Sequence, residues 1–113
     1  MTIEETYLHG GGEFLVGLLD GKFVAMGGFQ RLAEASAELR RMRVERGLQG
    51  RGYGTKLLHE LERLASQSGI RTLCLETARR RPSTLQFYSR CGYRATGQGF
   101  YGAIETVRFF KRI

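Results

Sequence analysis

Tryptophan is absent from this sequence, proline occurs once, and cysteine occurs only twice. The two cysteines, Cys74 and Cys91, form no CxxC pair, so neither a zinc site nor a disulfide framework is indicated. Both are predicted to be buried free thiols, and no metal site is expected. No apolar run reaches the roughly 18 residues that a membrane-spanning helix needs, so no membrane partner is expected.

One domain, residues 1–113, accounts for the whole sequence. A chain of 113 residues has no room for a second domain of ordinary size, and its 42% apolar residues can form a core. The single proline and the 26% charged residues argue against a disordered chain. Residues 1–12 contain Glu4 and Glu5 and no basic, apolar signal pattern, so a cytoplasmic protein is expected.

Acidic residues are scarce relative to basic ones, because 18 Lys and Arg stand against 11 Asp and Glu. The excess lies in residues 38–113, which carry a net charge of +10, whereas residues 1–37 carry −3. Fifteen of the 18 basic residues are Arg, whose planar guanidinium binds two phosphate oxygens at once. An anionic partner is therefore indicated, although a solvated basic surface would have the same composition.

A nucleic-acid-binding module is the main alternative from another functional class. Such a surface combines basic residues with exposed aromatic rings. Most aromatic residues here fall instead in apolar strand patterns, among them Phe14, Phe23, Phe109 and Phe110. No nucleic-acid partner is therefore expected.

Turn signals and apolar patterns predict an α/β fold with a mixed sheet flanked by helices. Asp20-Gly21 between two apolar runs indicates a hairpin, and helical apolar spacing predicts a helix from Tyr53 to a C-cap at Gly69. Pro82 favours the first turn of a second helix. One strand–helix–strand crossover and a terminal antiparallel pair complete the pattern. The expected strands cover residues 13–19, 22–30, 37–45, 71–77, 93–97 and 104–112, the second helix covers 83–90, and loops cover 31–36 and 99–102.

The most informative motif is a glycine-rich loop between a strand and the first helix. It reads Gln49-Gly50-Arg51-Gly52-Tyr53-Gly54-Thr55. The N-terminus of a helix has unpaired N–H groups and a partial positive charge, so it binds anions. Glycines let a phosphate approach the backbone where a Cβ would block it. The loop therefore predicts a phosphate or pyrophosphate site.

Two common phosphate motifs fit this loop poorly. A P-loop ends in Gly-Lys-Ser/Thr, whereas the order here is Gly54-Thr55-Lys56. A dinucleotide fingerprint needs a third glycine where Thr55 stands, although Glu76 imitates the ribose-binding acid of that motif. A glycine-rich connection without a ligand is the remaining alternative.

The spacing Gln49-x-x-Gly52-x-Gly54 resembles the Q/R-x-x-G-x-G/A acyl-CoA signature of the GNAT superfamily of N-acyltransferases. The strand before the loop is similar to the strand that precedes this signature in many members. Pro82–Tyr93 resembles the second motif of the family. The resemblance runs from about Glu13 to Ile113, and it implies a GNAT-like fold and direct transfer of an acetyl group from acetyl-CoA to a primary amine. Neither cysteine is expected to act as a nucleophile.

The resemblance also implies a site for acetyl-CoA, the acyl donor. The strand through Met42 and Val44 would align the pantetheine arm and the thioester carbonyl, and the glycine loop would hold the pyrophosphate. Arg81 stands where the family often has an Asn that contacts the cofactor. The expected acetyl-CoA-binding residues are Met42, Arg43, Val44, Gln49, Gly50, Arg51, Gly52, Tyr53, Gly54, Thr55, Arg81, Ser83, Tyr88 and Arg90.

Three residues are catalytic candidates by the same resemblance. Tyr88 matches the helix tyrosine that would protonate the departing thiolate, and from the residues alone it is equally a core aromatic. Glu76 ends a strand where some members carry a general base, and an ion pair with one of Arg79–Arg81 is its alternative. Glu38 is a second candidate base, with ordinary surface charge as its alternative, and water chains could also serve.

The N-terminal region departs from the family pattern. Most members open with a strand and two helices that form a wall of the acceptor site, whereas only 12 residues precede Glu13. A shortened member is therefore expected. The expected acceptor is a small-molecule or peptide amine. A homodimer could rebuild the missing wall from a partner chain, or the acceptor could be large enough to bind without it. An inactive relative that binds acyl-CoA without turnover is a further alternative.

Overall fold

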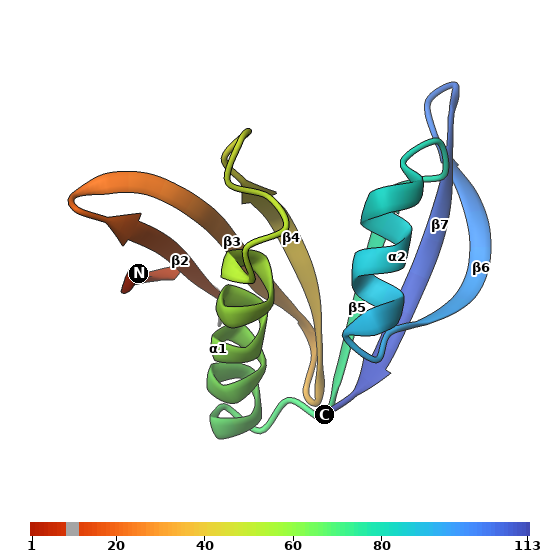
Figure 1. Ribbon diagram of the computed structural model, residues 1–113. Helices are drawn as coiled ribbons and strands as arrows, with labels where there is room; N and C mark the ends of the chain where they lie inside the picture. Colours follow the sequence, from red (N-terminus) through yellow and green to blue (C-terminus); the bar gives the residue numbers. More distant parts are fainter. Residues whose placement is uncertain (9–11) are drawn as a thin grey trace.

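The computed structural model describes the backbone of residues 1–8 and 12–113 and the side chains of residues 1–5 and 12–113. Within these residues the chain forms β1 (Thr2–Leu8), β2 (Gly12–Leu19), β3 (Lys22–Ala33), β4 (Ser36–Val44), α1 (Tyr53–Gln67), β5 (Thr72–Ala78), α2 (Pro82–Arg90), β6 (Arg94–Tyr101) and β7 (Ile104–Arg112). The strands make one sheet in the order β1-β2-β3-β4-β5-β7-β6 (Figure 1). Neighbouring strands are antiparallel except β4 and β5, which are parallel, so the predicted mixed sheet is confirmed.

Both helices lie against the same face of the sheet, with α1 over β2–β4 and α2 over the C-terminal strands (Figure 1). The apolar stripe of α1, which includes Leu57, Leu58 and Leu61, is fully buried and belongs to one core cluster with Leu15 and Phe29 of the sheet. Burial of these side chains, more than helix propensity, stabilises the helix on the sheet. The opposite face of the sheet carries neither described helix.

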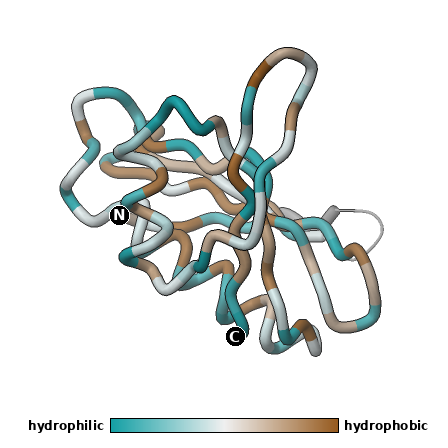
Figure 2. The backbone as a smooth tube through the Cα atoms, turned by 90° about the vertical axis from the view of Figure 1, so that its right-hand side faces the viewer, coloured by the Kyte–Doolittle hydropathy of each residue, from teal (hydrophilic) through white to brown (hydrophobic). Residues whose placement is uncertain are grey.

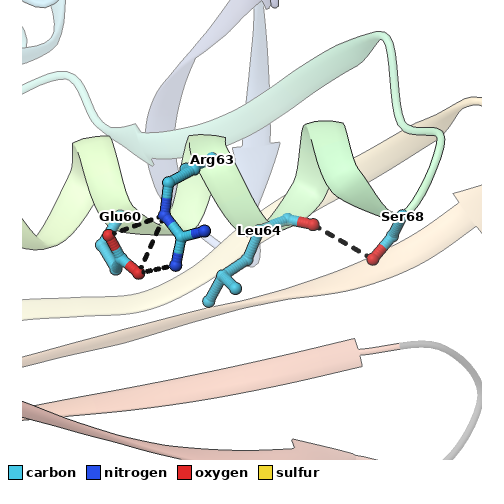
Figure 3. A network of polar contacts seen from close by, with 4 residues as sticks. All are labelled: Glu60, Arg63, Leu64 and Ser68. Carbon is cyan, nitrogen blue, oxygen red and sulfur yellow. Dashed lines mark hydrogen bonds and ion pairs between the residues drawn. The ribbon is translucent and has the colours of Figure 1, made fainter.

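The solvent face of α1 is polar (Figure 3). Arg63 forms an ion pair with Glu60 one turn earlier, and Ser68 Oγ donates a hydrogen bond of 3.0 Å to the Leu64 carbonyl at the C-terminus of the helix. The C-cap is Ser68, one residue before the predicted Gly69, and Gly69 follows with the left-handed φ of +84° that commonly ends a helix.

Strands β4 and β5 diverge after a short contact. Only Ser36–Glu38 pairs with Thr72–Cys74, although both strands continue well beyond these residues (Figure 1). A bulge in β4 contributes to this divergence, because the register with β3 slips between Gly28 and Met26, and Arg41 adopts a left-handed φ of 57° there. The last residues of β4 therefore have backbone groups that are not paired with β5.

The N-terminus differs from the sequence prediction. The first strand was expected at residue 13, yet β1 pairs with β2 from Thr2 to Leu8. Glu4 and Glu5 interrupt the apolar alternation, so the strand depends on pairing with β2 rather than on its own pattern. Among the described residues no helix lies between β1 and β2, and residues 9–11 lie outside the description.

Two expected loops are shorter than predicted. The loop at 31–36 is reduced to a turn, because β3 runs to Ala33 and β4 begins at Ser36. β6 runs through Tyr101, so the turn after it begins at Gly102 rather than Gly99. The glycine-rich sequence of β6 has little strand propensity, so the strand is stabilised mainly by its pairing with β7. The β6–β7 hairpin projects beyond the rest of the sheet, with hydrophobic residues near its tip (Figure 2).

Candidate active site

A cleft of about 520 Å³ opens between the end of β4, the glycine loop, the start of α1 and α2. All the residues predicted to bind acetyl-CoA line this cleft except Arg51, which is exposed outside it. The sequence analysis missed four lining residues: Leu48, Thr84, Phe87 and Cys91. Thr84 and Phe87 lie one helical turn from Tyr88 and Ser83 respectively, so helical spacing could have indicated them, whereas no local signal pointed to Leu48.

The glycine loop brings the start of α1 to the cleft. Gly50 and Gly52 adopt φ angles of +80° and +85°, a left-handed conformation that side chains disfavour. Gly52 is the N-cap residue, so no side chain satisfies the N–H groups of the first turn, and that turn contains no acidic residue. These N–H groups therefore remain available to an anion in the cleft.

Gly54 has a different role from the one its place in the motif suggested. A Cβ at this position would stand 3.1 Å from Val44 Cγ2 and 3.4 Å from the Phe87 ring. The glycine therefore lets α1 pack closely against β4 and α2, which keeps the cleft narrow.

The mouth of the cleft is positively charged. Arg43, Arg81 and Arg90 contribute to its lining. Arg81 is also the N-cap of α2, where Pro82 occupies the first turn and no side chain caps the helix. Met42 and Val44 pack on the α1 side of β4, so the Arg43 side chain between them points to the opposite face of the sheet. Two helix N-termini and the side chains of Arg81 and Arg90 thus lie at one cleft, an arrangement suited to a diphosphate.

Tyr88 lies at the inner wall of the cleft. Its side chain is 5% exposed, and its ring contacts Phe87 and Tyr93 edge-on and Phe109 at a tilt. Among the described residues its hydroxyl has no hydrogen-bond partner. Burial raises the pKa of Tyr88 above its ordinary value, so the phenol is protonated at neutral pH.

Neither cysteine is an activated nucleophile. Burial raises the pKa of the Cys91 thiol in the cleft and of the Cys74 thiol on β5. A thiol of raised pKa has little thiolate at neutral pH. Both thiols are free but only half-buried, whereas the sequence predicted buried thiols. The part of the chain that the structure describes contains no cluster of three or more His, Cys, Asp or Glu placed to hold a metal ion.

Glu38 and Glu76 do not line this cleft. Both line a second, shallower hollow of about 440 Å³. On β5, Leu73 and Leu75 are buried in the core beneath the helices, so Glu76 and Cys74 point to the opposite face of the sheet. The two carboxylates that the sequence placed with Tyr88 are therefore separated from it by the sheet.

Each glutamate has a partner on that face. Glu38 accepts a hydrogen bond of 2.6 Å from Arg40 Nε, and Glu76 accepts one from the Thr106 hydroxyl. The expected alternative for Glu76 was an ion pair with a residue of Arg79–Arg81. No such pair occurs among the described residues, and Arg79 instead lies 3.5 Å from Glu105.

The cleft and the hollow approach each other through the sheet. Phe109 lines the hollow, and its ring centroid lies 6.0 Å from that of Tyr88, which lines the cleft. Leu75 also lines the hollow and belongs to the same core. One layer of side chains next to the divergence of β4 and β5 therefore separates the two spaces. Neither helix in the described part of the chain is long and apolar enough to cross a membrane.

Comparisons with known proteins agree with this geometry. A profile of the acetyltransferase (GNAT) family matches residues 2–93. The fold is similar to an IAA acetyltransferase from Bacillus cereus, with a TM-score of 0.83 and 23% identity over 90% of this chain and 78% of that chain. It is also similar to a GNAT-family acetyltransferase from Staphylococcus aureus, with a TM-score of 0.85 and 24% identity over 94% of this chain and 71% of that chain.

A third similar structure is a GNAT-family acetyltransferase from Elizabethkingia anophelis with acetyl-CoA bound. Its TM-score is 0.79 at 14% identity, over 90% of this chain and 76% of that chain. No curated protein sequence matches this chain at a significant level. The structural likenesses confirm the expected fold, and the family profile covers most of the sequence. The chain belongs to the acetyltransferase (GNAT) family.

Proposed function

We propose that this protein transfers an acetyl group from acetyl-CoA to a primary amine by direct attack. The observation that carries the proposal is the convergence of two uncapped helix N-termini and the side chains of Arg81 and Arg90 on a cleft beside the end of β4 that is not paired with β5. These groups suit the diphosphate and the amide-rich arm of coenzyme A. Members of the family typically use acetyl-CoA, and a structure of similar fold contains it.

The cleft would orient the donor along its length. The first-turn N–H groups of α1 and the side chain of Arg81 would bind the diphosphate. The backbone of Met42–Val44, which β5 leaves unpaired, would hydrogen-bond to the pantetheine arm and bring the thioester carbonyl to the divergence of the strands. A backbone N–H at that point would stabilise the oxyanion that forms during attack.

The reaction then exchanges one bond for another. The amine lone pair attacks the thioester carbon, a C–N bond forms, and the C–S bond breaks. Tyr88 is placed to give its phenolic proton to the departing thiolate. A phenol of raised pKa is a weaker acid than the thiol it produces, so its donation depends on close positioning at the moment the thiolate leaves.

The amine must lose a proton, and Glu76 is the better of the two candidate bases. It lies on β5 next to Leu75, which belongs to the layer that separates the hollow from the cleft, and its only described partner is the neutral hydroxyl of Thr106. Glu38 already accepts a hydrogen bond from Arg40, so one of its carboxylate oxygens is occupied.

Thermal unfolding with acetyl-CoA, followed by a thiol-release assay across a panel of amines, tests the proposal. Saturation at 100 times Kd should stabilise the chain by about 2.7 kcal/mol, roughly 10 °C for a domain of this size. Acetyl-CoA-dependent release of thiol only when an amine is present would support transfer. Stabilisation without release for any amine would instead identify a relative that binds acyl-CoA without turnover, and no stabilisation would remove the donor site.

A further inference from the structure

The hollow on the helix-free face of the sheet contains two opposite charges on neighbouring strands. Glu76 of β5 and Arg108 of β7 are direct partners in the antiparallel register, and both line the hollow. Both side chains are exposed, on the face opposite the core. Their neighbours along the strands, Leu75 and Phe109, belong to the layer that separates the hollow from the cleft.

These two charges lie close together without neutralising each other. Glu76 accepts a hydrogen bond from the Thr106 hydroxyl, and Arg108 Nη2 donates one of 3.2 Å to the Gln98 carbonyl. Both partners are neutral, and within the described residues Glu76 and Arg108 form no ion pair. A carboxylate and a guanidinium thus keep part of their capacity for a ligand that carries both signs of charge.

Gly99 of β6 keeps the space between them open. A Cβ on Gly99 would stand 3.1 Å from Glu76 Oε2, 3.2 Å from Arg108 Nη2 and 3.3 Å from the Thr106 hydroxyl. The three polar groups therefore surround one point, and a methyl group would occupy it. The φ of Gly99 is not in the left-handed region, so backbone conformation does not require glycine at this position.

The rest of the hollow is mainly apolar. Cys74 and Phe110 line it on the same face as the charged pair, and Phe110 is 37% exposed. Glu38 at the other side is neutralised by Arg40. The hollow therefore offers one anion, one cation and an apolar wall.

We propose that the amine acceptor is a small aminocarboxylate with an apolar side chain, such as a free α-amino acid. This inference rests on the proposed acetyl transfer. The carboxylate binds to Arg108 through a charge-assisted hydrogen bond. The amino group gives a proton to Glu76 and reaches the thioester carbonyl through the gap where β4 and β5 diverge. The apolar side chain packs toward Phe110. A diamine would bring its second ammonium group against Arg108, and a peptide N-terminus has no carboxylate at that distance from its amine.

The first test compares acceptors that differ in one group. Thiol release is measured with L-phenylalanine, with phenethylamine, which lacks only the carboxylate, and with putrescine. We expect kcat/KM for L-phenylalanine to exceed that for each of the other two by about 10-fold or more. Arg108→Gln should lower the ratio of the L-phenylalanine value to the phenethylamine value by a similar factor. Arg112→Gln, which removes a charge from the same strand outside the hollow, should leave the ratio unchanged.

The second test uses two glycines of β6. Gly99→Ala should raise KM for L-phenylalanine several-fold, because its methyl group fills the point that the amino acid needs. Gly97→Ala is the matched control, since a Cβ there meets nothing within 4 Å. Circular dichroism and thermal unfolding of both variants show whether each is folded.

The outcomes separate the inference from the proposed function. Equal use of L-phenylalanine, phenethylamine and putrescine, with no effect of Arg108→Gln on their ratio, would overturn the aminocarboxylate while acetyl transfer stands. If acetyl-CoA binds but no amine is acetylated, the transfer itself fails. Titration calorimetry with L-phenylalanine then decides the site: binding that Arg108→Gln weakens supports it, and no binding overturns it.

Discussion

Replacing the buried tyrosine of the cleft is the sharpest test of how the protein would act. Tyr88→Phe removes one hydroxyl that has no described hydrogen-bond partner and leaves the ring contacts with Phe87, Tyr93 and Phe109 in place. Loss of a general acid costs roughly 10²- to 10⁴-fold in rate. We expect kcat to fall by about 100-fold, with the Kd for acetyl-CoA nearly unchanged because the hydroxyl acts only as the thiolate departs.

Tyr93→Phe is the matched control. Tyr93 is also buried and contacts the ring of Tyr88, but it lies outside the cleft and donates a hydrogen bond of 2.8 Å to Glu62. Its removal should cost about 1 kcal/mol of stability and lower Tm by several degrees, because Glu62 keeps its ion pair with Lys111. It should leave kcat unchanged.

Steady-state thiol release measures kcat, calorimetry measures the Kd for acetyl-CoA, and thermal unfolding measures Tm. The reasoning would be refuted if Tyr88→Phe kept its turnover, since the phenolic proton would then have no part in the reaction. An equal loss of kcat in both variants would also refute it, because that result would assign the effect to packing of the aromatic cluster.

Two further predictions concern the loop and the sheet. Gly52→Val should abolish acetyl-CoA binding in calorimetry. The control Gly47→Val, at a similar φ of +88° but outside the cleft, should lower stability and leave the affinity for acetyl-CoA unchanged. Equal losses of affinity in the two variants would contradict the role of the loop. Glu13 is 7% exposed, and burial, followed by the nearby charge of Glu5, raises its pKa. The contribution of Glu13 to the free energy of unfolding is therefore most favourable where its carboxyl is protonated, and it falls as pH rises through the folded pKa. Glu13→Gln should therefore raise Tm at pH 8 and change it little near pH 4, as measured by thermal unfolding across that range. A lower Tm at pH 8 would show that the ionised Glu13 carboxylate does not destabilise the fold.

Much of the cleft could be predicted because its signals are local. The apolar spacing from Tyr53 to Ala65 fixes the buried face of α1, and the glycines at 50 and 52 provide the positive φ that the turn before the helix needs. Both features depend on residues a few positions apart. The sequence alone therefore located the cleft at the start of α1 and the helix tyrosine that lines it.

The placement of the carboxylates could not be predicted in the same way. A strand pattern shows that Glu76 and Leu75 point to opposite faces, but not which face the helices cover or which strand lies alongside. The same holds for β1, whose pairing with β2 no local pattern revealed.

The sequence by itself determined the secondary structure around the glycine loop and most of the residues that line the cleft, because helix caps, turns and apolar periodicity are short-range properties. Only the tertiary structure decided that Glu76 faces away from Tyr88 and lies opposite Arg108, 32 positions further along the chain. The physical reason is that sheet register and strand order arise from long-range pairing and burial, which place groups that the chain itself keeps far apart.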